Sequence, residues 1–211
     1  MTVAGLTGNY GMGKSTVARL FRELGACTID TDELVRSLLT EEEVLSEVRE
    51  AFGPEVMRGG IIDRKALADA VFADAHLRIG LENILHARVF RRVEDALSRL
   101  SSQGCQVAIV EAPVLFERGY QNRFDAVITV HTPEEVALRR LEAKGISRQE
   151  GLRRLESQFP VETKCLRSDW SIDNSGTPEE TRQQVEYVYR ELVDLDNRQT
   201  GGPRGSGHGG N

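Results

Sequence analysis

Residues 3–21, VAGLTGNYGMGKSTVARLF, place a glycine-rich turn directly between a short apolar run and a helical pattern. The run TVAGLTG predicts a β-strand, and the apolar residues that follow Lys14 recur at helical spacing until Gly25. A strand, a glycine loop and a helix in direct succession indicate a sheet in which the carboxyl end of one strand leads through the loop to a helix N-terminus.

The loop itself, Gly8 to Ser15, matches the pattern G-x-x-x-x-G-K-[ST] at every fixed position. Glycines let successive backbone amides point inward, and the start of a helix adds the positive end of its dipole, so a chain of phosphates fits this loop. We therefore predict that the phosphates of a nucleoside triphosphate bind here, at Gly8, Gly11, Met12, Gly13, Lys14, Ser15 and Thr16.

Each polar residue of the loop has an expected role. Lys14 should reach the β- and γ-phosphates, Ser15 should hold Mg²⁺ through its hydroxyl, and Thr16 should contact the α-phosphate. The alternative is a plain turn followed by a routine helix cap. Such a turn would not require Gly11, Gly13 and Lys14 together.

Four further strands are predicted, at 26–30, 106–112, 126–132 and 169–174. The middle ones are apolar almost throughout, which is typical of parallel strands covered by helices on both faces. The predicted fold class is therefore α/β, a doubly wound parallel five-stranded sheet.

The connection from residue 31 to residue 105 is far longer than a single crossover helix. Its sequence predicts helices at 33–39, 41–52, 64–73 and 75–101. We expect these helices to form an inserted lobe, at about 33–105, over the carboxyl edge of the sheet, where open α/β sheets bind ligands.

Composition limits the remaining possibilities. A chain of 211 residues with 39% hydrophobic residues predicts one domain at 1–198, followed by a flexible glycine-rich tail at 199–211. A net charge of −6 argues against nucleic-acid binding. Without an apolar run of membrane-spanning length we expect no membrane partner and a cytoplasmic location, with Cys27, Cys105 and Cys165 as free thiols.

Two acidic residues, Asp30 and Asp32, lie at the end of the second predicted strand, in the segment IDTDEL. Either Asp30 or Asp32 could accept the proton of an acceptor hydroxyl near the phosphate loop. Asp32 could instead be the N-cap of the helix that follows, and the residues alone do not decide between these roles.

Basic residues accumulate after the fourth predicted strand, over a helical hairpin at about 134–160. This hairpin is typical of a lid that closes over transferring phosphates, although most such charges belong to solvated helix faces. Arg140 and Arg148 are the predicted phosphate contacts.

Glu111, which ends the third predicted strand, is either a carboxylate near Mg²⁺ or an ordinary strand-end residue.

Several segments together resemble the dephospho-CoA kinase family. They are the loop region LTGNYGMGKSTVARLFRELGACTIDTDELVR and then AFGPEV, GGIIDRKALADAVF, LENILHARV, EAPVLFERG, RFDAVITVHTPEEVALRRLEAKGIS and DWSIDNSG, in that order, from about Val3 to Tyr189. The resemblance implies phosphorylation of the ribose 3′-hydroxyl of dephospho-CoA by ATP, the last step of coenzyme A synthesis.

By position, the resemblance makes Asp32 the general base, Arg140 a lid arginine and the inserted lobe the acceptor-binding region. His86 is a contact to the acceptor on the same grounds, or else a buried histidine bonded to a backbone carbonyl. Ala87 stands where the family usually has proline, and Asn9 and Tyr10 replace small or aliphatic residues at positions that mainly offer backbone amides.

Two other functions share some of these features. Another small-molecule or nucleoside P-loop kinase would have the same loop and lid but a different inserted lobe, and FGPEV with IIDRKAL favours the dephospho-CoA family. A GTPase switch would carry an N-K-x-D-like signature for guanine, which this sequence lacks.

Overall fold

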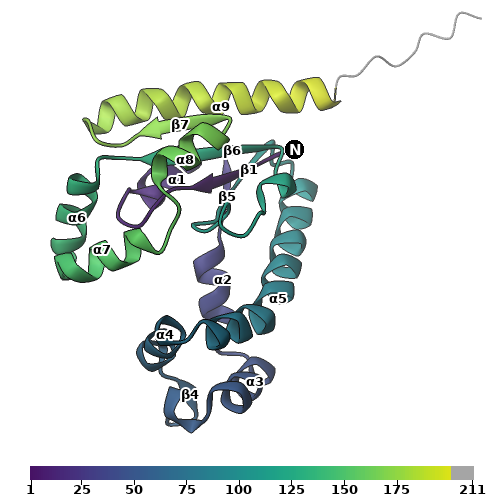
Figure 1. The fold of residues 1–211 in the computed structure, drawn as a ribbon. Coiled ribbons are helices and arrows are strands. Elements are labelled where there is room, and N and C mark those ends of the chain that lie inside the picture. Colours follow the sequence, from purple (N-terminus) through teal and green to yellow (C-terminus); the bar gives the residue numbers. More distant parts are fainter. Residues whose placement is uncertain (201–211) are drawn as a thin grey trace, which may run out of the picture. The chain divides into compact units, whose positions relative to one another are not determined.

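The computed structural model describes residues 1–200, whose main sheet has five parallel strands in the order β2-β5-β1-β6-β7 (Figure 1). The strands are β1 (Thr2–Thr7), β2 (Cys27–Asp30), β5 (Val107–Glu111), β6 (Ala126–His131) and β7 (Trp170–Asp173). All five predicted strands are confirmed, and so is the α/β fold class.

The central strand β1 brings the phosphate loop to the carboxyl edge of the sheet. Leu6 of β1 is in register with Glu111 of β5, and Thr7 with Thr129 of β6. Because the strands are parallel, their carboxyl ends meet at this edge. The loop therefore begins beside Glu111, which ends β5.

Helices α1 (Lys14–Glu23) and α9 (Pro178–Thr200) pack on one face of the sheet. Val17 and Phe21 of α1 and Val188 of α9 belong to one buried cluster with side chains from the strands, including Leu6. Apolar side chains at helical spacing thus cover the apolar side of the strands, and their burial drives this packing.

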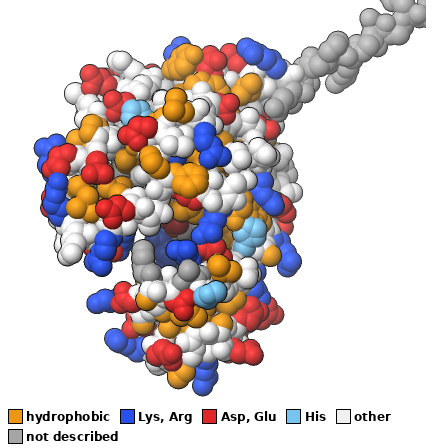
Figure 2. Space-filling view, in the orientation of Figure 1, with side chains coloured by type: hydrophobic (Ala, Val, Ile, Leu, Met, Phe, Trp, Pro, Cys, Tyr) orange, Lys and Arg blue, Asp and Glu red, His pale blue; other side chains and the backbone are white. Residues whose placement is uncertain are grey.

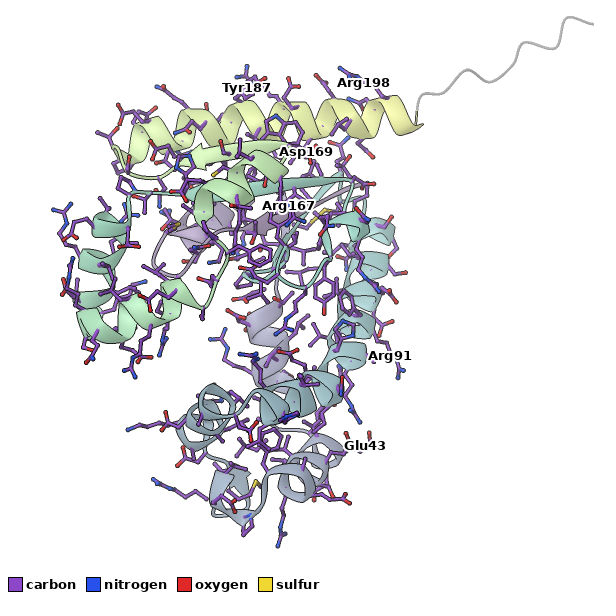
Figure 3. All side chains as sticks on the ribbon, viewed as in Figure 1. Glu43, Arg91, Arg167, Asp169, Tyr187 and Arg198 are labelled. Carbon is purple, nitrogen blue, oxygen red and sulfur yellow. A yellow bond between two sulfur atoms is a disulfide. The ribbon has the colours of Figure 1, made fainter. Side chains whose placement is uncertain are left out.

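The opposite face is covered by the segment between β5 and β6 and by α8 (Val161–Arg167). A side chain at Gly5 would place its Cβ only 2.5 Å from Leu115, so glycine is needed there. Arg167, labelled in Figure 3, lies with its guanidinium carbon 4.6 Å from the ring centre of Phe116. Asp169 then accepts a hydrogen bond from Val127 of β6.

Two more helices follow β6, at α6 (Glu134–Glu142) and α7 (Arg148–Glu156). In Figure 1 they form a hairpin, and α8 follows it. Leu141 of α6 and Leu155 of α7 are buried, while a side chain at Gly151 would lie 2.9 Å from Leu138. Glycine at this position lets the two helices pack closely without moving these leucine side chains.

The described chain divides into two compact units, one of residues 1–29 with 100–200, which contains the sheet, and one of residues 30–99. The second unit contains α2 (Thr31–Leu38), α3 (Glu42–Phe52), the 3₁₀ turn η1 (Pro54–Val56), β3 (Met57–Arg58), β4 (Ile61–Ile62), α4 (Arg64–Ala73) and most of α5 (Ala75–Ser102). Its own core includes Val44, Val48, Phe52, Leu67 and Leu85. All four helices predicted in this region are confirmed.

The hairpin of β3 and β4 was not predicted. Gly59 and Gly60 connect the strands, with φ angles of 60° and 85° that match the two central residues of a type I′ turn. Each strand has only two residues, too few to show a period-two pattern. The sequence signal for this hairpin was the pair Gly59 and Gly60, which is typical of a two-residue turn between strands.

The cysteine prediction is wrong for two of the three residues. Cys27 and Cys105 form a disulfide across 78 positions of sequence, whereas Cys165 is free. The two cysteines lie at the start of β2 and just before β5, which are neighbours in the sheet. Tertiary proximity brings the two sulfurs together, and no spacing in the sequence indicates it.

Reduction with dithiothreitol is expected to lower the melting temperature, because a cross-link over so long a loop typically contributes about 2 to 4 kcal/mol. A thermal melt with and without the reductant measures the effect. Cys27→Ser should melt at the lower temperature under both conditions, and Cys165→Ser should keep the sensitivity. Equal melting temperatures for the oxidised and reduced wild-type chain would contradict the expectation.

Residues 201–211 of the predicted tail lie outside the described residues, and Gln199 and Thr200 form the end of α9.

No helix within residues 1–200 is long and apolar enough to cross a membrane. On the face shown in Figure 2, the Lys and Arg side chains are interspersed with Asp and Glu.

Candidate active site

The glycines of the phosphate loop are sterically required. Gly8, Gly11 and Gly13 have φ angles of 144°, 79° and 91°, which side chains rarely adopt. A Cβ on Gly8 would lie 2.3 Å from the carbonyl oxygen of Val130, and one on Gly13 would lie 2.1 Å from Nδ2 of Asn174. The loop therefore packs as bare backbone against its neighbours.

The N-terminus of α1 can hold an anion. Its N-cap is Gly13, which supplies no side-chain acceptor, and its first turn contains no acidic residue. The side chains of Ser15 and Thr16 are exposed. An uncapped helix start with exposed hydroxyls is suited to binding phosphate oxygens.

Lys14 lies across the loop, where Nζ donates to the carbonyl oxygens of Gly8 at 2.8 Å and Asn9 at 3.2 Å. Its ammonium group is thus held at the phosphate loop, although Lys14 is the first residue of α1. Met12 differs from its neighbours because its side chain is only 2% exposed, so any nucleotide contact from Met12 must come from its backbone.

Arg140 of α6 is placed beside the loop. Its Nη2 donates to the carbonyl oxygen of Asn174 at 2.8 Å, whereas its buried Nη1 has no partner within residues 1–200. That nitrogen is 3.6 Å from the point where a Cβ on Gly13 would lie. A buried cationic donor without an acceptor, at an anion-binding loop, indicates that an anionic ligand supplies the acceptor.

Arg148 is held differently. It donates to both carboxylate oxygens of Glu135, at 3.1 Å and 2.6 Å, and so joins α7 to α6. These hydrogen bonds lower the pKa of Glu135 and raise the pKa of Arg148. Of the two predicted lid arginines, the structure brings only Arg140 beside the loop.

The acidic pair after β2 is resolved into two roles. Asp30 is the N-cap of α2, because its Oδ1 accepts hydrogen bonds from the backbone of Asp32 at 2.8 Å and Glu33 at 3.2 Å. The alternative that Asp32 caps this helix is therefore wrong. Asp32 lies in the first turn with an exposed side chain.

His86 is exposed on α5, with its ring centre 4.6 Å from that of Phe90. The alternative of a buried histidine is therefore wrong. The helix continues through Ala87, as expected where proline is absent.

Asn174, which follows β7, was missed by sequence reasoning. Its Nδ2 donates to the carbonyl oxygen of Met12 at 2.9 Å, while its own carbonyl accepts from Arg140. It thereby joins the phosphate loop to the lid arginine. Its place at the carboxyl end of a strand was the available signal.

A parallel sheet that leads into this loop, with a lysine across the loop and an arginine beside it, defines a P-loop kinase, a class that uses ATP as its co-substrate. A family model described as dephospho-CoA kinase matches residues 2–180. The chain belongs to the dephospho-CoA kinase family, which confirms the resemblance.

Individual relatives agree. The dephospho-CoA kinase of Aquifex aeolicus is 43% identical over 90% of this chain and 96% of its own. The crystal structure of TT1252 from Thermus thermophilus has a TM-score of 0.81 at 37% identity, covering 90% of this chain and 97% of that one. The dephospho-CoA kinase of Campylobacter jejuni has a TM-score of 0.68 at 27% identity, covering 92% and 98%.

Proposed function

We propose that this chain transfers the γ-phosphoryl group of ATP to the ribose 3′-hydroxyl of dephospho-CoA and so completes coenzyme A synthesis. Family membership supports the choice of acceptor. The observation that carries the transfer is the buried Nη1 of Arg140 beside Gly13, a cationic donor that has no acceptor within residues 1–200.

On the nucleotide side, the amides of Gly11 to Thr16 bind the phosphate oxygens, and Lys14 and Arg140 offset the negative charge that spreads over the transferring group. Arg148 contributes by bracing the lid at 134–160 through Glu135, and it reaches a phosphate only if that ion pair opens.

The residues fit a Mg²⁺ ion. This ion usually takes one or two protein oxygens and completes its octahedron with phosphate oxygens and water. Ser15 offers an exposed hydroxyl in the first turn of α1. When bound there, Mg²⁺ would neutralise charge on the β- and γ-phosphates.

On the acceptor side, Asp32 takes the proton as the 3′-oxygen bonds to phosphorus and the bond to ADP breaks. Asp32 follows β2 by two residues, and β2 ends at the edge of the sheet where the phosphate loop begins. Asp30 supplies the cap, so the carboxylate of Asp32 is not needed for it. The lobe at 33–105, with His86 exposed on α5, binds the rest of the acceptor.

The acceptor is tested by measuring ADP release with dephospho-CoA, adenosine and shikimate. We expect kcat/KM to be at least about a hundredfold higher for dephospho-CoA, because binding of its remote groups supports the transfer step. Direct detection of coenzyme A separates transfer from ATP hydrolysis. Equal or better use of another acceptor would reject the proposed substrate while leaving the kinase class intact.

A further inference from the structure

Asn9 and Tyr10, at loop positions that were expected to offer mainly backbone amides, contact the far end of the lid. Asn9 is 4% exposed and its Nδ2 donates to the carbonyl oxygen of Phe159 at 3.0 Å. The backbone N–H of Tyr10 donates to Oε1 of Gln158 at 2.8 Å. In Figure 1 the loop before α1 lies beside the segment that leaves α7, in agreement with these bonds.

Tyr10 makes a second contact, with Arg154 in the last turn of α7. The guanidinium donates to the hydroxyl of Tyr10 and also lies over its ring, with the carbon 4.7 Å from the ring centre. The same guanidinium donates to Glu150 at 2.8 Å. A hydrogen bond and a cation–π contact together orient Arg154 toward the phosphate loop.

The segment after α7 is also anchored to the segment between β5 and β6. The N–H of Phe159 donates to Oε1 of Glu117 at 3.0 Å, and Nζ of Lys164 lies 2.7 Å from the same oxygen. Lys164 is fully buried, which lowers its pKa, and it also donates to the carbonyl oxygen of Pro113. This buried ion pair fixes the exit of the lid.

We propose that Tyr10 is a positioning residue for the lid, which it holds through Arg154. The exit of α7 is anchored at Phe159, so the Tyr10–Arg154 contact sets where the last turn of α7 lies relative to the phosphate loop. The lid is thereby arranged for the triphosphate before the nucleotide binds. Only one expected effect, the ratio of ATP hydrolysis to phosphoryl transfer, rests on the proposed function.

Loss of the contact between Tyr10 and Arg154 should weaken ATP binding and let water reach the transferring phosphoryl group. We expect Tyr10→Ala and Arg154→Ala each to raise the Kd and KM for ATP about tenfold, the scale of a part-buried cation–π contact with a charged hydrogen bond. Both variants should increase ATP hydrolysis relative to transfer, because a displaced lid excludes water less well. Tyr10→Phe, which keeps the ring, should have an intermediate effect.

Arg153 provides a matched control. Both Arg153 and Arg154 pair with Glu150, at 2.7 Å and 2.8 Å, but only Arg154 has a contact with Tyr10. Arg153→Ala should therefore leave the Kd for ATP within about twofold, since surface ion pairs contribute little. Tyr187→Ala, at an exposed tyrosine of α9 labelled in Figure 3, controls for loss of an aromatic ring.

The double variant Tyr10→Ala/Arg154→Ala completes the test. If Tyr10 acts through Arg154, the double variant should bind ATP no more weakly than either single variant. Additive effects, or equal effects of Arg153→Ala and Arg154→Ala, would overturn the proposal. ATP affinity is measured by titration without an acceptor, so this result stands even if dephospho-CoA proves not to be the substrate.

Discussion

Lys14→Ala is expected to reduce turnover by about a thousandfold or more, because it removes the cation that stabilises charge on the transferring phosphoryl group. The melting temperature without ligand should fall by only a few degrees. Nζ of Lys14 bonds the backbone carbonyls of two buried residues, Gly8 and Asn9, and a typical hydrogen bond contributes only about 1 kcal/mol net. Steady-state ADP release and a thermal melt measure both quantities.

Lys144→Ala is the control for this change. Lys144 is an exposed lysine of the lid loop, and its removal should leave turnover nearly unchanged. Near-normal turnover in Lys14→Ala would contradict the phosphate-loop chemistry proposed for this site. A large loss of melting temperature would instead show that Lys14 mainly stabilises the fold.

Asp32→Asn is expected to lower turnover by roughly a hundredfold or more while ATP still binds, since an amide cannot accept the acceptor's proton. The structure sharpens this test because Asp30, and not Asp32, caps α2. The melting temperature of Asp32→Asn should therefore stay close to that of the wild type. Turnover, ATP affinity and melting temperature are measured for each variant.

Two neighbours of Asp32 serve as controls. Glu33→Gln removes an exposed charge from the same helical turn and should leave turnover within about threefold, because Glu33 has no proposed role in proton transfer. Asp30→Ala should lose about 1 kcal/mol of stability, the usual cost of losing an N-cap. An active Asp32→Asn enzyme would reject Asp32 as the base.

The strands and helices of this chain were predictable because their signals are local. Apolar periodicity located α4 at 64–73 and α5 from 75, and continuous apolar runs located the strands. The hairpin of β3 and β4 escaped prediction because two residues carry no periodicity.

The sequence left open whether Asp32 is the helix cap or the base, and it did not indicate that Asp30 is the cap. Both are good capping residues, and the choice depends on which of them takes an extended backbone. Asp30 does, with φ −97° and ψ 110°, and its carboxylate then reaches the first free amides of α2.

The sequence alone determined the phosphate loop, since eight successive residues, Gly8 to Ser15, carry the complete motif. Only the tertiary structure decided which side chains meet at that loop. Tyr10 and Arg154 are 144 positions apart, Asn174 and Met12 are 162 apart, and Cys27 and Cys105 are 78 apart. Such contacts depend on how β2, β5, β1, β6 and β7 are ordered in the sheet, and local sequence patterns do not specify that order.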